Sequence, residues 1–398
     1  MSALSEIEPD EFLSKLQAAF DRMPVEDWSG RRAVVALSGG LDSTVLLHAL
    51  ARLQLPATLA AIHVDHGLHT DSADWAAHCA RLAASLEIQY SSIRVDVAQG
   101  DGRSLEAVAR EARYQAFADS LQTGDVLLTA HHGDDQLETV LLRLLRGTGV
   151  RGLTAIHAFA SLNSAFIARP LLEFARSELQ VKAMEWQLKW LEDPSNLDLR
   201  FDRNFLHSQI LPQMIERWPA AHRVSTRLAR QMSEAETLLG DLASLDLAAV
   251  HEPGCIPVAV LTSLSDARLH NVLRHAIRTL ELPVPSAAQL GEIRQALAAR
   301  EDAEVLVSWS GAEARIYRDH LYLMAPLPTA RAGWWRCWSR LAIGSVRDSR
   351  CSDSSRNQQR DAIDERWGRG HTTHPADARF CSGRGRAGDA LALAPRRR

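Results

Sequence analysis

The six residues from 38 to 43, Ser-Gly-Gly-Leu-Asp-Ser, combine two hydroxyl side chains, two glycines and a carboxylate. They follow the apolar run 33–37, which is typical of a buried parallel strand, and precede an apolar run at 45–47 that indicates a helix. The glycines allow a tight turn close to a ligand, and Asp42 or Ser43 is expected to cap the helix. Free N–H groups at a helix N-terminus attract anions, so this segment is predicted to bind phosphate. No Gly-Lys-Ser/Thr follows, which excludes a Walker A loop.

Acidic and histidine side chains gather in a second segment, 129–139, which reads Thr-Ala-His-His-Gly-Asp-Asp-Gln-Leu-Glu-Thr. On a helix, Glu138 lies three positions after Asp135 and four after Asp134, so the carboxylates cluster on the first turns. Capping and the helix dipole account for one acid, but three acids and two histidines exceed that need. Such carboxylates could hold Mg²⁺ on bound phosphates, or orient an ammonium group and take its proton.

Two further pairs of polar side chains lie at positions whose role the residues alone leave open. His63 lies near the end of the apolar run 57–64, and Asp65 follows it. A metal site is disfavoured there, because neighbouring side chains of a strand point to opposite faces, and contacts to a nucleoside are preferred. Arg110 and Arg113 share one face of a predicted helix. They form either a solvated ladder of charges or a site for nucleotide or RNA phosphate.

Apolar runs that alternate with helical periodicity surround these segments. This alternation predicts an α/β fold with a Rossmann-like, doubly wound parallel sheet, in which ligands bind beyond the carboxyl ends of the strands. Strands are expected at 33–37, 57–64, 90–97, 126–130 and 165–168, with helices at 11–20, 74–86, 104–121, 134–145 and 177–190. Closer to the C-terminus, helices are expected at 264–280 and 286–299 and strands at 304–309 and 314–317.

Composition and charge favour a cytoplasmic enzyme without a membrane partner. The chain is 46% hydrophobic with a net charge of −4, and no apolar run is long enough to cross a bilayer. Its acidic N-terminus lacks the apolar stretch of a signal peptide. The five cysteines contain no Cys-x-x-Cys pair, which argues against a zinc ribbon, an iron–sulfur cluster or a disulfide framework.

Periodicity and composition divide the chain into four parts. Residues 1–205 hold the predicted parallel sheet, 206–248 form a helical connector, and 249–326 form a small α/β domain. The tail 327–398 is atypical, because after residue 330 it has 15 Arg, no Lys and 7 acidic residues. It is either a disordered basic arm for RNA phosphates or an out-of-frame sequence, and its content of Trp and Cys favours the second.

Seven motifs occur in order along the chain: Ser-Gly-Gly-Leu-Asp-Ser, His-Val-Asp-His-Gly-Leu, Ala-Arg-Glu-Ala-Arg-Tyr, Thr-Ala-His-His-Gly-Asp-Asp-Gln-Leu-Glu-Thr, Leu-Leu-Arg-Gly-Thr-Gly, Arg-Pro-Leu-Leu and Glu-Asp-Pro-Ser-Asn. Together they resemble the tRNA(Ile)-lysidine synthase family of the PP-loop, or ATP pyrophosphatase, superfamily over about residues 32–211. The resemblance implies a PP-loop ATP-binding catalytic domain at 1–205 and a domain at 249–326 that assists tRNA binding.

The resemblance also implies an activity, that of an ATP-dependent ligase. Free L-lysine would be joined to C2 of the wobble cytidine in a tRNA(Ile) with a CAU anticodon, through an adenylated cytidine. AMP and pyrophosphate would be released, and the tRNA would change from reading AUG to reading AUA and from methionine to isoleucine identity. A homodimer is implied as well.

The site implied by the resemblance joins the segments described above. Mg²⁺ is expected on Asp42 and Asp135, and Asp135 or Glu138 is expected to orient the lysine amine and take its proton. The residues expected to hold ATP are Ser38, Gly39, Gly40, Leu41, Asp42, Ser43, His63 and Asp65. The residues expected to act in catalysis are Asp42, Asp135, Glu138, Arg110, Arg113 and His131, the last three facing phosphates or a flipped-out base.

Two positions depart from the family pattern, since His69 and His207 stand where the family usually has arginine. If these positions touch RNA, its binding here is weaker or more pH-dependent. Two other functions stay open: a different adenylating enzyme, such as a tRNA thiolase or an amidotransferase, and a non-catalytic nucleotide- or RNA-binding module. The missing Cys-x-x-Cys pair and catalytic-cysteine signature disfavour the first, and the intact loop and acid cluster disfavour the second.

Overall fold

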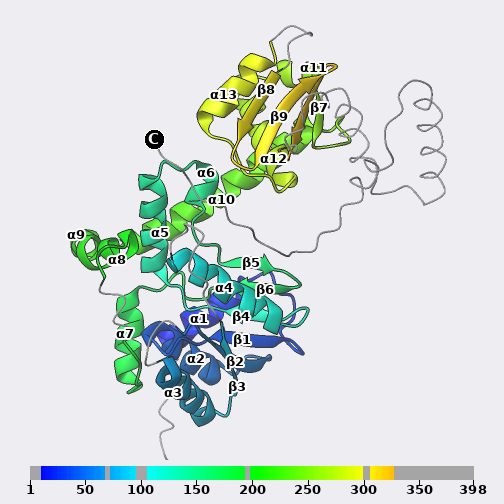
Figure 1. The fold of residues 1–398 in the computed structure, drawn as a ribbon. Coiled ribbons are helices and arrows are strands. Elements are labelled where there is room, and N and C mark those ends of the chain that lie inside the picture. The colour runs from blue at the N-terminus through cyan, green and yellow to red at the C-terminus, as the bar shows by residue number, and fades with distance from the viewer. Residues whose placement is uncertain (1–9, 68–71, 96–104, 193–197, 299–304, 327–398) are drawn as a thin grey trace, which may run out of the picture. The chain divides into compact units, whose positions relative to one another are not determined.

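The computed structural model describes residues 10–67, 72–95, 105–192, 198–298 and 305–326 (Figure 1). The tail at 327–398, with both interpretations of it, lies outside these described residues, and so does His69. No helix among the described residues is long and apolar enough to cross a membrane.

A six-stranded sheet is the centre of the first part of the chain. Its strands are β1 (Arg32–Ala36), β2 (Thr58–Asp65), β3 (Gln89–Arg94), β4 (Val126–Leu128), β5 (Phe159–Leu162) and β6 (Ala165–Ala168). Their order is β3-β2-β1-β4-β6-β5, with β1 parallel to both of its neighbours and β5 antiparallel to β6. The winding reverses at β1, and such sheets bind ligands where the winding reverses, here between the loops that follow β1 and β4. The predicted doubly wound α/β fold is confirmed.

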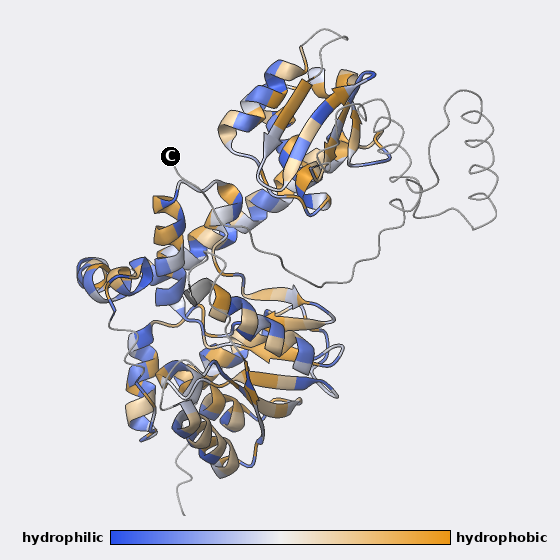
Figure 2. Cartoon of the chain, viewed as in Figure 1, coloured by the Kyte–Doolittle hydropathy of each residue, from blue (hydrophilic) through white to orange (hydrophobic). Residues whose placement is uncertain are grey.

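Helices cover both faces of this sheet because its central strand is apolar on both sides. The helices are α1 (Glu11–Asp21), α2 (Leu41–Leu53), α3 (Ser72–Ser85), α4 (Leu105–Ser120), α5 (Gly133–Leu145), α6 (Val150–Leu153) and α7 (Arg176–Glu185). Ala33 and Val35 of β1 belong to a core shared with α1, α2, α3 and α7, whereas Val34 belongs to a core with Phe117 of α4. The hydrophobic colour of the central strands in Figure 2 reflects this burial on two sides.

One strand and the end of one helix in this domain differ from the prediction. Strand β5 was not expected; it pairs with β6 through a tight turn in which Asn163 adopts a left-handed conformation with φ of +52°. The helix expected to reach residue 190 ends at Glu185, because Gln187 also adopts a left-handed conformation, with φ of +54°. Neither residue is a glycine, so these turns have no clear signal in the amino-acid sequence.

The expected capping of α2 by Asp42 or Ser43 is wrong. Gly40 is the N-cap, so Asp42 and Ser43 lie inside the first turn, and no side chain caps the helix. Gly39 precedes this turn with φ of +85°, and its carbonyl accepts the N–H of Leu191 at 2.9 Å. The loop is thus held tightly against a distant segment of the chain.

The connector is helical as predicted but is interrupted twice. After α8 (Asp202–Phe205), which ends the predicted sheet domain, the connector consists of a π-helix (Leu206–Ile210), α9 (Leu211–Arg217) and α10 (Ala221–Asp246). Pro212 lacks the N–H that would continue the α-helical pattern, and the helix widens to a π-turn just before it. Trp218 leaves the helical conformation because Pro219 follows it.

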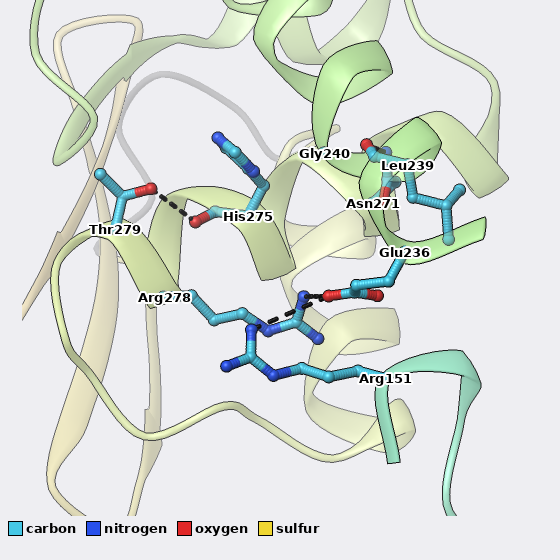
Figure 3. Close-up of a pocket in the computed structure, with 8 residues that line it drawn as sticks. All are labelled: Arg151, Glu236, Leu239, Gly240, Asn271, His275, Arg278 and Thr279. Atoms are coloured by element: carbon cyan, nitrogen blue, oxygen red, sulfur yellow. Dashed lines mark hydrogen bonds and ion pairs between the residues drawn. The ribbon is translucent and has the colours of Figure 1, made fainter. Parts of the chain in front are cut away.

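The small C-terminal domain contains α11 (Val258–Thr262), α12 (Asp266–Thr279), α13 (Ala287–Ala296) and the strands β7 (Cys255–Pro257), β8 (Val305–Trp309), β9 (Ala312–Tyr317) and β10 (His320–Met324). The strand order is β7-β10-β9-β8, and β7 and β10 were not predicted. A polar cavity of about 300 Å³ lies beside α6, α10 and α12. There Glu236 pairs with Arg278 at 2.8 Å and with Arg151 at 3.8 Å, as Figure 3 shows.

Replacing Gly39 with alanine is expected to lower the Tm by more than the same change at Gly30. Both glycines have positive φ, +85° and +77°, which costs an L-residue about 1–2 kcal/mol. At Gly39 the new Cβ would also meet Leu191 Cδ1 at 3.0 Å and Cys79 Sγ at 3.1 Å, whereas at Gly30 it meets nothing within 4 Å. Calorimetry of both variants measures the difference, and equal Tm shifts would contradict the proposed crowding.

Candidate active site

The loop after β1 presents an uncapped helix N-terminus. The Ser43 hydroxyl donates to the Gly40 carbonyl at 3.1 Å and accepts the Ser38 N–H at 3.2 Å. The Ser38 hydroxyl accepts the Gly40 N–H at 3.3 Å, and Ser38 is exposed. These bonds fix the shape of the loop, while no side chain takes the first N–H groups of α2. The loop therefore offers backbone donors and the positive end of the helix dipole to an anion.

His132, at the start of α5, joins this loop to the segment after β4. Its Nε2 lies 3.7 Å from Asp42 Oδ2 and 3.4 Å from Asp135 Oδ2. The side chain of Asp135 also accepts the His132 backbone N–H at 3.0 Å, which closes the N-terminal turn of α5. The two segments predicted to do chemistry thus meet at the reversal of the sheet.

The two carboxylates control the charge of His132. Burial by itself lowers the pKa of this imidazole, but Asp135 and Asp42 outweigh burial and raise the pKa to about 9. The Asp134 N–H also donates to Nδ1 at 3.3 Å, which only a neutral ring could accept. Two carboxylates outweigh one long hydrogen bond, so we assign the imidazolium at pH 7.

Arg203, from α8, holds the two acids of α5 together. Its Nη2 lies 3.0 Å from Asp135 Oδ1, and its Nε forms an ion pair with Glu138 Oε1. Burial raises the pKa of Asp135, but the charges of His132 and Arg203 and the hydrogen bond from the His132 N–H reverse this and lower it. Glu138 is only 1% exposed, so its charge depends on this pairing.

Several carboxylate oxygens near the loop are buried without a hydrogen-bond partner. They include Asp42 Oδ1 and Asp134 Oδ1. Such atoms are costly unless a ligand satisfies them, and a Mg²⁺ ion with one or two protein carboxylates and phosphate oxygens would do so. No group of three or more protein ligands for a metal ion occurs in the described part of the chain. Asp42, with one buried oxygen unpartnered, therefore fits a Mg²⁺ ion that is brought by a nucleotide. Both oxygens of Asp135 are engaged by His132 and Arg203, so its part in holding Mg²⁺ stays a prediction.

His131 differs from its neighbour in charge. Burial lowers its pKa to about 3, and Arg169 and Arg110 act in the same direction, while Asp135 opposes them. Its Nδ1 lies 2.8 Å from the Thr129 hydroxyl. His131 is consequently neutral at pH 7 and can serve a ligand only as a hydrogen-bonding group.

Arg110 and Arg113 flank one aromatic ring on α4. Their guanidinium carbons lie 5.1 and 6.0 Å from the centroid of Tyr114. Arg110 is exposed, and its charge helps to lower the pKa of His131. Arg113 is half-buried; burial is the main cause that lowers the pKa of His66, and the charge of Arg113 lowers it further. Their binding of phosphate stays a prediction.

The two residues predicted at the end of β2 are engaged with the backbone. His63 Nδ1 lies 2.9 Å from the Leu37 carbonyl, just before the loop that follows β1, so Nδ1–H donates to this carbonyl. Asp65 accepts the Gly67 N–H at 2.8 Å in a turn. These bonds orient both side chains at the ligand-binding edge, and their contacts with adenosine stay a prediction.

Sequence reasoning missed two residues that complete this arrangement. His132 stands beside His131 in the chain, and nothing in the motif distinguishes their environments. Arg203 lies 65 or more positions from both of its acidic partners, so no local pattern could pair them. The one signal in the sequence for these two residues was indirect: three clustered acids require positive charges beside them.

Stability is expected to be greatest near pH 6.5, because the two neighbouring histidines have opposite pKa shifts. His132, with its pKa raised to about 9, stabilises the fold fully below pH 6.5 and loses this contribution as the pH rises through 9, a loss of about 3 kcal/mol. His131, with its pKa lowered to about 3, makes stability fall as the pH drops from 6.5 towards 3.

Calorimetric Tm values at pH 4.5, 6.5 and 9.5 (set roughly by these pKa values) measure both limbs. His132→Asn should flatten the alkaline limb, whereas His48→Asn, on the outer part of α2, should leave it unchanged. A wild-type Tm that does not fall between pH 6.5 and 9.5 would refute the charged state assigned to His132.

Comparison with known proteins identifies two domains in the chain. A PP-loop domain model matches residues 12–214, and a TilS substrate binding domain model matches residues 256–322. Among solved structures, a U34-tRNA thiolase from Methanococcus maripaludis is 19% identical with a TM-score of 0.46, covering 56% of this chain and 79% of that chain. That likeness is too remote to carry an argument.

Curated relatives are much closer. The chain is 44% identical over 294 residues to a tRNA(Ile)-lysidine synthase from Alkalilimnicola ehrlichii, covering 72% of this chain and 65% of that protein. The protein of the same name from Pseudomonas fluorescens is 46% identical, covering 62% and 58%, and that from Methylococcus capsulatus is 39% identical, covering 77% and 71%. The chain thus spans 58% to 71% of the length of these relatives. It belongs to the tRNA(Ile)-lysidine synthase family of PP-loop proteins.

Proposed function

We propose that this chain is an ATP-dependent ligase that joins L-lysine to C2 of the wobble cytidine in a tRNA(Ile) with a CAU anticodon. The observation that carries the proposal is the meeting of Asp42, from the uncapped loop, with Asp135 through His132. A phosphate-binding loop beside paired acids suits the activation of an oxygen by ATP followed by attack of an amine. Family membership supports tRNA as the substrate.

The first step is adenylation. The loop at 38–43 holds the pyrophosphate of ATP, and His63 and Asp65 contact the adenosine. When bound, Mg²⁺ on Asp42 and Asp135 neutralises phosphate charge. The cytidine O2 attacks the α-phosphorus, the bond to the β-phosphate breaks, and pyrophosphate leaves.

The second step is attack by lysine. The ε-amine attacks C2 of the adenylated cytidine, the C2–O bond breaks, and AMP leaves. Only the neutral amine is a nucleophile, so the ammonium proton must pass to a base. Asp135 or Glu138 takes this role, since both lie on one face of α5 and both are paired with Arg203.

The remaining residues and partners follow from the same scheme. Arg110, Arg113 and His131 face the phosphates or the flipped-out cytidine. The domain at 249–326 assists tRNA binding, and the chain acts in the cytoplasm as a homodimer.

Incorporation of labelled lysine into a tRNA(Ile) transcript with a CAU anticodon tests the proposal. The wild-type chain should incorporate lysine only with ATP. Asp42→Ala, Asp135→Asn and Glu138→Gln should each lower the rate by about 100-fold or more, because they remove groups that act on the phosphates or the amine.

Glu173→Gln is the matched control, because Glu173 pairs with Arg22 at the surface and should leave the rate unchanged. ATP binding without lysine incorporation by the wild-type chain would refute the function proposed for it. Near-normal lysine transfer by both Asp135→Asn and Glu138→Gln would refute only their role as base.

A further inference from the structure

A series of side-chain contacts leads from the surface to Glu138, the buried acid of α5. Arg176, the first residue of α7, places Nη1 2.8 Å from Nε2 of His207. The other ring nitrogen of His207, Nδ1, lies 3.4 Å from Glu138 Oε2. Three segments of the chain, α7, the π-helix and α5, thus converge on one carboxylate.

The chemistry of arginine determines which nitrogen of His207 carries the hydrogen. A guanidinium has only donors, so Nε2 must accept from Arg176 and cannot carry a hydrogen itself. The hydrogen of the neutral ring therefore resides on Nδ1, which faces Glu138.

The backbone around His207 explains how the ring reaches Glu138. His207 is the second residue of the π-helix, whose wider turn precedes Pro212. Inserted turns of this type are frequent at functional sites because they redirect side chains.

We propose that His207 is a positioning residue for Glu138: Nδ1–H, fixed by Arg176, holds Oε2 of the carboxylate while Arg203 holds Oε1. The inference rests on the proposed function, in which Glu138 receives a proton from the lysine amine. The 3.4 Å contact is long, as catalytic hydrogen bonds often are in enzymes without bound substrate. A neutral donor orients the carboxylate without adding a second full positive charge, which leaves it a better base.

Two amide substitutions separate this role from a structural one. Asn has its amide nitrogen where His has Nδ1, so His207→Asn keeps the donor for Glu138 and loses the contact with Arg176. Gln reaches the position of Nε2, so His207→Gln keeps the contact with Arg176 and loses the donor. We expect His207→Asn to stay within about threefold of wild-type lysine transfer, and His207→Gln to lose about tenfold or more in kcat.

A second pair of variants tests whether Arg176 acts through His207. Arg176→Met should lower kcat for lysine transfer by a few-fold, because Nε2 loses its donor and the ring can adopt the other tautomer. In a His207→Gln background, Arg176→Met should add little further loss, since residues that act in series are not additive. ATP binding and Tm, measured for every variant, should change little.

The matched control is the other Arg–His pair of the fold, in which Arg52 Nη1 lies 3.3 Å from His48 Nδ1 on α2. His48→Asn and His48→Gln should both leave lysine transfer unchanged. Equal rates for His207→Asn and His207→Gln, or rescue by Gln and not by Asn, would overturn the proposal.

The tautomer gives a readout that does not depend on activity. Long-range ¹⁵N–¹H spectra of ring-labelled protein, with the His207 signal assigned by its loss in His207→Asn, should show a protonated Nδ1 and an unprotonated Nε2. A protonated Nε2 would overturn the proposal even in an active enzyme. The expected tautomer in a chain that fails to ligate lysine would instead locate the failure in the proposed function.

Discussion

Negative charges brought together at the edge of a sheet repel one another unless a positive charge lies between them. In this protein His132 supplies that charge, since its Nε2 lies 3.7 Å from Asp42 and 3.4 Å from Asp135. The contact requires β1 and β4 to be neighbours, because Asp42 follows one strand and Asp135 the other. The pairing of these two parallel strands and the charge of the site are therefore parts of one arrangement.

Helix α8, at the end of the predicted sheet domain, contributes to the same balance of charge. The guanidinium of Arg203 in α8 pairs with Asp135 and Glu138 of α5. A carboxylate as buried as Glu138, at 1% exposure, needs such a partner to offset the cost of burying its charge. The packing of α8 against α5 therefore completes the site.

Most of the fold was predicted from two patterns of apolar residues in the sequence. Apolar runs located β1, β2, β3, β4 and β6, and the 3.6-residue pattern located the helices between them. In the sheet domain and the connector, the errors fall where one residue sets the backbone: Asn163 in the turn into β5, Gln187 after the end of α7, and Pro212 beside the π-helix. Apolar patterning says little about these positions because they involve no change in burial.

The sequence by itself determined the fold class, the glycine-containing loop after β1 and the group of acids on the first turns of α5, because each depends on residues close together in the chain. Tertiary structure alone decided that His132 and not His131 faces the acids, and that Arg203 pairs with Glu138. The physical reason is that helical spacing shows which side chains share a face, whereas charge and hydrogen bonding depend on what packs against that face. His131 and His132 are adjacent in the chain, yet the pKa of the first is lowered and that of the second is raised, because different groups surround them.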